Sequence, residues 1–186
     1  MIYPLKLESA LVVTGLVLIA THALALIRPI TTQDWLRAFP RSSAAGLLLL
    51  VTAAIWSWLL VAYIDLGEFT NWRPRILVFI PVAAFLTWKY VDEFLAARAL
   101  GMVVLLAAEP LLEAAWMRPE AGRLLLVVLA YAFITFALFW IGMPYTLRNQ
   151  IAWLTKHEGR WRTAAFAGIC YGAVLLILPL TLHRSA

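Results

Sequence analysis

Charged side chains are scarce in this sequence. Asp, Glu, Lys and Arg make up 13% of its 186 residues, whereas they make up about 25% of an average soluble domain. Hydrophobic residues make up 64%, and the mean hydropathy is +0.88. The chain also lacks a long Pro-, Gly- or Ser-rich linker and a polar segment large enough to form a separate core. This composition excludes an ordinary soluble protein and predicts one integral membrane domain over residues 1–186.

Cysteine and histidine are almost absent. The only cysteine, Cys170, lies in an apolar run, so an internal disulfide and a thiolate metal site are both excluded. His22 is the only histidine within an apolar run, and a haem held by two membrane histidines would need a second one. We interpret His22 as a hydrogen-bonded histidine near a helix end, and keep it as a weak candidate for the sole ligand of a pigment or metal.

Recognisable catalytic signatures are missing as well. The sequence contains no Ser/His/Asp set, HExxH motif, Gly-rich phosphate loop or carboxylate cluster with metal-ligand spacing, so it predicts no catalytic residue, no metal site and no particular cofactor. The net charge is +5, but the basic residues stand singly or in pairs beside apolar runs. That placement indicates contact with lipid headgroups and excludes nucleic acid as a partner.

Six apolar runs are present, each near the length of about 20 residues that a bilayer requires. We therefore expect an all-α, polytopic membrane protein with about six transmembrane helices. The third run is short and the fourth carries charge, so these two form either full spans or a re-entrant pair. The expected spans lie near 8–27, 44–64, 74–89, 94–116, 122–143 and 163–182.

The distribution of basic residues between the two sides of such a bundle is uneven by six to nine, which favours both termini outside. The chain carries no eukaryotic targeting or retention signal, so we expect a multi-pass protein of the bacterial inner membrane.

Two connections have helical periodicity of their own. "TTQDWLRAFPRS" places Trp35, Leu36 and Phe39 at i, i+1 and i+4, with Thr31 or Thr32 available as a cap. "YTLRNQIAWLTKHEGRWR" places its apolar residues at i, i+4 and i+7, namely Leu147, Ile151 and Leu154. We expect both to form short amphipathic helices in the headgroup plane.

The fourth run, "RALGMVVLLAAEPLLEAAW", carries charge inside an apolar helix. On an ideal helix Arg98, Glu109 and Glu113 fall on one face within about 60°. Arg98 is about 16 Å from Glu109 along the helix, so the partner of Glu109 must be another helix, another subunit, an ion or water. Pro110 is expected to kink the helix next to Glu109 and to free the carbonyl of Leu106.

Two interpretations of this face compete. Glu109, with Glu113 nearer the surface, either binds a proton or cation in a carrier cycle or makes a structural polar contact with a neighbouring helix. A carrier needs more polar groups along its path than these apolar runs contain, so the structural contact is favoured.

The last run contains a helix-packing pattern. "TAAFAGICYGAVLL" places Ala164, Gly168 and Gly172 at intervals of four, which lets another backbone approach closely. The pattern does not say whether the neighbour is internal, a second copy or another subunit.

The function predicted from these features is a non-catalytic subunit or scaffold of a larger membrane complex, with membrane lipids and other membrane subunits or a second copy as partners. The alternative is a small carrier or ion-coupled transporter using Glu109. A third hypothesis is an enzyme acting on lipid or quinone, in which basic and acidic residues from the connections converge on a headgroup site: Arg28, Arg37 or Arg41 with Asp65, Glu68 or Asp92.

Overall fold

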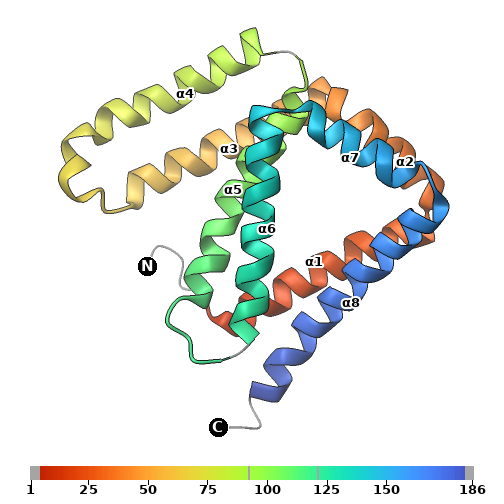
Figure 1. The fold of residues 1–186 in the computed structure, drawn as a ribbon. Helices are drawn as coiled ribbons and strands as arrows, with labels where there is room; N and C mark the ends of the chain where they lie inside the picture. The colour runs from red at the N-terminus through yellow and green to blue at the C-terminus, as the bar shows by residue number, and fades with distance from the viewer. Residues whose placement is uncertain (1–4, 92, 121, 183–186) are drawn as a thin grey trace.

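The computed structural model describes residues 5–91, 93–120 and 122–182, and no strand occurs in them. Eight α-helices and two short 3-10 helices follow one another along the chain (Figure 1). In order they are α1 (Leu7–Ile27), α2 (Pro29–Ala38), η1 (Phe39–Arg41), α3 (Ser43–Tyr63), η2 (Gly67–Trp72), α4 (Arg73–Tyr90), α5 (Leu95–Ala115), α6 (Gly122–Gly142), α7 (Tyr145–Thr155) and α8 (Glu158–Leu182).

Five of these helices, α1, α3, α5, α6 and α8, are long and apolar enough to cross a membrane. The expectation of an all-α, multi-pass membrane protein is thereby confirmed. The helix expected near 74–89 forms as α4 but is not among the five, because its 18 residues include Arg73, Arg75 and Lys89.

The connectivity explains why α4 is needed. Gly46, near the start of α3, lies against Leu95 and Ala96 at the start of α5, and Ile64, just after α3, lines the same groove as Glu109 near the end of α5. The two helices therefore run in the same direction, and the chain must return between them. Helix α4 makes this return and packs against α3 (Figure 1).

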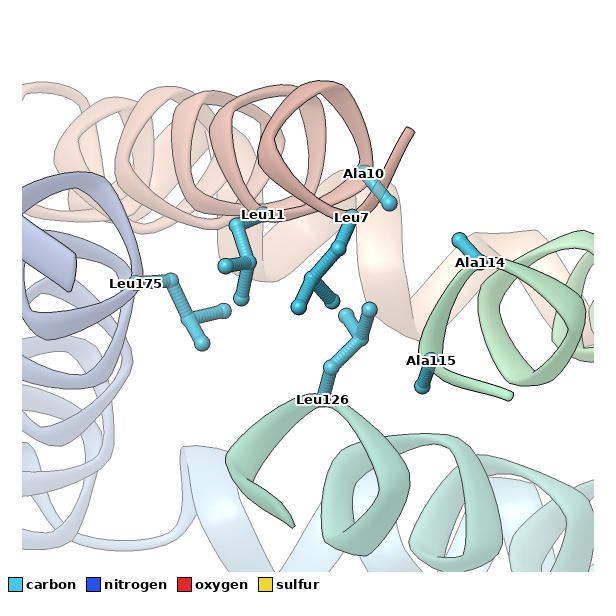
Figure 2. Close-up of a cluster of buried hydrophobic side chains, with 7 residues drawn as sticks. All are labelled: Leu7, Ala10, Leu11, Ala114, Ala115, Leu126 and Leu175. Atoms are coloured by element: carbon cyan, nitrogen blue, oxygen red, sulfur yellow. The ribbon is translucent and has the colours of Figure 1, made fainter. Parts of the chain in front are cut away.

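The long helices also form two antiparallel pairs. Helix α1 packs against α8, and α5 packs against α6 (Figure 1). The pairs meet around Leu11, Leu126 and Leu175, whose side chains are fully buried and point toward one another in Figure 2. Ala114 and Ala115 at the end of α5 line the same core. We call this end of the molecule, where α1 begins and α5 ends, the Leu7 end.

The opposite end is covered by α2, η1 and α7, and we call it the α2/α7 end. Leu147 and Ile151 of α7 are buried with Phe39, Ala96 and Ala97 over the start of α5. Both connections thus contain the expected helices, while their position in the headgroup plane stays a prediction.

The prediction that Thr31 or Thr32 caps the start of α2 is wrong. Helix α2 begins at Pro29, so Thr31 and Thr32 lie inside it, and the hydroxyl of Thr32 donates to the carbonyl of Arg28. Proline suits the first helical position because its fixed φ is already helical and its missing N–H would have had no intrahelical acceptor.

Distant side chains satisfy the carbonyls that four helices leave free at their carboxyl ends. Trp161 Nε1 donates to the carbonyl of Ala25 at 3.0 Å, and Arg98 Nη1 donates to that of Ile141 at 3.0 Å. The corresponding bonds at α3 and α7 run from Arg73 Nη2 to Ile64 at 2.6 Å and from Arg37 Nη2 to Thr155 at 3.0 Å. Positive side chains also complement the negative end of the helix dipole.

Candidate functional site

A groove of about 700 Å³ lies over the second half of α5, between the end of α3 and the middle of α6. Its walls are mostly apolar, but Asp65, Glu109 and Glu113 all line it. It is the site in which the two glutamates of α5 meet residues from other elements. The complete lining consists of Ile64, Asp65, Leu105, Ala108, Glu109, Leu112, Glu113, Trp116 and Ile134.

Helix periodicity brings the two glutamates into the groove together. Glu109 and Glu113 are four residues apart, so they lie one turn apart on the same side of α5. Six residues separate Glu109 from the end of α5, which places it about 9 Å inside the helix. Trp116 lines the groove just beyond that end. The groove therefore starts at the Leu7 end and reaches toward the middle of the spanning segment.

Asp65 reaches the groove through the parallel packing of α3 on α5. Its Oδ1 accepts a 3.0 Å hydrogen bond from the amide of Gly67, which closes a turn directly after α3. Gly67 has φ of +51°, a conformation that side chains disfavour and glycine adopts freely. Sequence reasoning did not join Asp65 to the glutamates, because only the direction of α3 relative to α5 brings them together.

Glu109 stands out among the polar residues around the groove. Within the described residues Glu109 forms no hydrogen bond or ion pair. Arg73 is close to one wall of the groove, because its Nη2 donates to the carbonyl of Ile64 at 2.6 Å, and its buried Nε has no hydrogen-bond partner among the described residues. The groove therefore brings three carboxylate side chains together, with one arginine beside Ile64.

Arg98 is not part of the groove. It lies near the start of α5, where its guanidinium bonds the carbonyl of Ile141 at the end of α6, while its buried Nε has no partner among the described residues. The structure thus separates Arg98 from Glu109 and Glu113, and α5 runs as one helix through Pro110.

His22 is packed between α1 and α8. Its Nδ1 lies 2.8 Å from the carbonyl of Leu18, one turn earlier, and its ring covers Gly168. No group of three or more His, Cys, Asp or Glu side chains placed to hold a metal occurs in the described part of the chain. The 2.8 Å contact between Nδ1 and the Leu18 carbonyl agrees with the interpretation of His22 as a hydrogen-bonded histidine.

The small residues of α8 face α1. The carbonyl of Gly172 lies 2.8 Å from where a side chain on Gly15 would begin, and the reverse approach has the same distance. Gly168, one turn earlier, adjoins the imidazole of His22, and Ala164 is half-buried one further turn back. In this structure Gly168 and Gly172 thus contact a helix of the same chain, whereas a contact for Ala164 stays a prediction.

The groups required for a lipid or quinone enzyme lie at opposite ends of α3. Arg41 precedes α3 and Asp65 follows it, so the helix separates them by about 30 Å. Arg37 is bonded to Thr155 of α7, far from Glu68 in η2. Among the described residues, Arg37 and Arg41 therefore do not converge with Asp65 or Glu68. Asp92 lies outside the described residues, so its part of the hypothesis stays a prediction.

A second cavity, of about 340 Å³, lies between α3, α4 and α5. It is lined mainly by alanine and leucine, and its polar side chains are Ser57 and Thr87. The Thr87 hydroxyl donates to the carbonyl of Ala83 within its own helix. This cavity offers apolar contact and little else.

Comparison with known protein families, with curated protein sequences and with solved structures gives no match for this chain. The α5 groove is therefore interpreted from its own geometry.

Proposed function

We propose that this protein is a non-catalytic subunit of a membrane complex, and that the α5 groove receives a transmembrane helix of a different protein that carries a basic residue. The observation that carries the proposal is the position of Glu109, about 9 Å inside a spanning helix and in an open groove.

Lipid is a poor partner for this groove. An ionised carboxylate at the centre of a spanning helix costs at least about 2.5 kcal/mol, and acyl chains offer it no hydrogen bond. A lysine or arginine on a partner helix would supply both charge and donors to Glu109, while Leu105, Leu112 and Ile134 would supply apolar contact.

A second copy of this chain does not fit the groove as well. The basic residues inside its five spanning helices, Arg98, Arg123, Arg160 and Arg162, all lie within the first two turns of their helices. Arg98 is moreover bonded to Ile141. No described lysine or arginine of these five helices is thus placed to meet Glu109 at its depth, which favours a different partner chain.

The carrier hypothesis has less support from the geometry. Glu109 is reached from the Leu7 end, whereas Phe39, Ala97 and Ile151 form an apolar layer over the start of α5 at the other end. The neighbouring cavity adds only two hydroxyl groups. A proton or cation released from Glu109 would meet an apolar barrier.

We also propose that the protein lies in the inner membrane of a bacterium. The test is purification of the tagged protein from the separated inner and outer membranes of its native host. Native mass spectrometry in mild detergent then identifies what is bound. Two variants probe the groove: Glu109→Gln removes one charge and Leu112→Trp fills space. Their matched controls are Glu68→Gln in exposed η2 and Leu138→Trp on the exposed side of α6.

We expect the wild type and both controls to retain a stoichiometric partner, and both groove variants to lose at least about nine-tenths of it. A wild-type protein that purifies as a monomer or a homo-oligomer would overturn the proposal. So would a partner that remains fully bound to both groove variants. Ion-dependent uptake abolished by Glu109→Gln would instead establish the carrier.

A further inference from the structure

A third cavity, of about 300 Å³, lies at the α2/α7 end, where α2 and α7 are side by side (Figure 1). We call it the basic pocket. Three of its lining residues are basic: Arg37 from α2, Arg148 from α7 and Lys156 directly after α7. Pro40, Ile151, Ala152 and Thr155 complete the lining. Its size is at the lower end of the range of about 300–1,000 Å³ typical of small-molecule sites.

The guanidinium of Arg37 is held in place within this pocket. Its Nε donates to Oγ1 of Thr155 and its Nη2 to the carbonyl of Thr155, both at 3.0 Å. Nη1 lies on the other side of the group, 3.9 Å from Oδ1 of Asp34, and the Arg37 side chain remains 51% exposed. Two fixed hydrogen bonds reduce the conformational freedom that an anion would otherwise have to remove on binding.

The other two cations approach from α7. The guanidinium of Arg148 lies over the ring of Phe94 at 5.6 Å and contacts the side-chain oxygen of neighbouring Asn149 at 3.3 and 3.4 Å. Lys156 is exposed. The carboxylate of Asp34 lies 3.9 Å from one of these three cations, Arg37, so the four side chains together carry a net positive charge and attract anions.

The surroundings of the pocket match the membrane surface. Helices α2 and α7 join the ends of spanning helices, and this is where we expect the lipid headgroups. Trp35 of α2 and Trp153 of α7 are 61% and 60% exposed, as is typical of the aromatic belt. Buried Pro40 and Ile151 give the pocket an apolar floor. Basic pockets at this level are known to bind the headgroups of anionic lipids.

We propose that Arg37, Arg148 and Lys156 form a binding site for the phosphodiester headgroup of one anionic phospholipid. The phosphate accepts hydrogen bonds from the three cations, and the acyl chains leave along the apolar sides of α2 and α7. This site lies at the end of the molecule opposite the α5 groove, so it does not depend on the proposed partner.

The test uses the purified full chain in a neutral detergent, freed of lipid and titrated with dioleoylphosphatidylglycerol or dioleoylphosphatidylcholine. Native mass spectrometry counts the bound lipids. The main variant is Arg148→Gln/Lys156→Gln, because it leaves the Arg37–Thr155 bonds that help to hold α2 on α7. The matched control, Arg28→Gln/Arg162→Gln, removes the same charge from exposed positions at the same end.

The expected result is one tightly bound phosphatidylglycerol per chain in the wild type and control, and an affinity lower by about tenfold or more in the pocket variant. Phosphatidylcholine should bind weakly to all three. Equal losses in the pocket variant and the control would overturn the proposal, because general surface charge would then explain the binding. A wild type without preference for phosphatidylglycerol would also overturn it.

A further experiment distinguishes a lipid ligand from a free phosphate ion. Inorganic phosphate at millimolar concentration, without lipid, is expected to leave the melting temperature unchanged, whereas phosphatidylglycerol raises it. If inorganic phosphate raises the melting temperature equally in the wild type and has no effect in the pocket variant, the site binds a soluble anion and the lipid assignment is wrong.

Discussion

Gly168 of α8 lies directly beneath the imidazole ring of His22 on α1, so close that a side chain at this position would overlap the ring. The ring is fixed by its Nδ1, 2.8 Å from the carbonyl of Leu18. The antiparallel helices α1 and α8 can therefore approach this closely only because Gly168 has no side chain where the ring of His22 lies.

Replacing Gly168 with alanine is expected to lower the free energy of unfolding by about 1–3 kcal/mol, the usual range for overpacking. The decisive measurement is a double-mutant cycle with His22→Ala, followed by unfolding in mixed detergent. Removing the ring should restore most of the loss. Gly159→Ala, at a helical position with open space around it, serves as the control and should not destabilise the protein. A loss in Gly168→Ala that His22→Ala leaves intact would contradict this contact.

The next glycine of α8 should behave differently. A side chain on Gly172 would begin 2.8 Å from the carbonyl of Gly15, and a backbone oxygen cannot be removed by substitution. We therefore expect Gly172→Ala to destabilise the pair of helices by at least as much as Gly168→Ala, and to be insensitive to His22→Ala. Rescue of Gly172→Ala by that change would show that the backbones of α1 and α8 are further apart.

Arg98 is expected to contribute to stability through α6. Arg98→Met keeps much of the side-chain length but leaves the carbonyl of Ile141 without its donor, which should cost about 1–3 kcal/mol of unfolding free energy. Hydrogen exchange at the last turn of α6 should also increase. Arg118→Met, at an exposed position between α5 and α6, should change neither quantity. Equal stability of the two variants would contradict the role of Arg98 as a cap for α6.

The path of α4 can be tested by labelling. In a Cys170→Ser background, single cysteines at Glu68 and Glu93, both exposed and on either side of α4, should react with a membrane-impermeant maleimide from opposite sides of the membrane. The reason is that α3 and α5 are parallel, so the chain between them must return to its starting side. A cysteine at Arg41 should react from the same side as one at Glu93. Labelling of Glu68 and Glu93 from one side would show that α4 does not cross.

The sequence was informative where the physical signal is local. Long apolar runs predict helices because backbone groups in a membrane must bond within their own segment, and α1, α3, α5, α6 and α8 form close to the expected positions. Helix α8 begins at Glu158, earlier than expected. The apolar run did not reveal this start, because the first residues of the helix are polar.

The candidate site was only partly visible in the sequence. The spacing of Glu109 and Glu113 placed them on one face, but Asp65 joins them through the parallel packing of α3 and α5, which leaves no local pattern. The bonds from Arg98 to Ile141 and from Trp161 to Ala25 likewise join residues far apart in the chain. Such contacts depend on which helices become neighbours, and that is set by packing of the whole chain.

The antiparallel pairing of α1 with α8 also has a consequence for biosynthesis. A ribosome makes about 5–20 residues per second, so α1 enters the membrane several seconds before α8 exists. During that interval Gly15 and His22 have no α8 to pack against. Helix α1 must therefore remain in the bilayer with its contact surface covered by lipid or by an insertion factor. A variant in which α8 could not pack at all would leave the first helix inserted but unpaired.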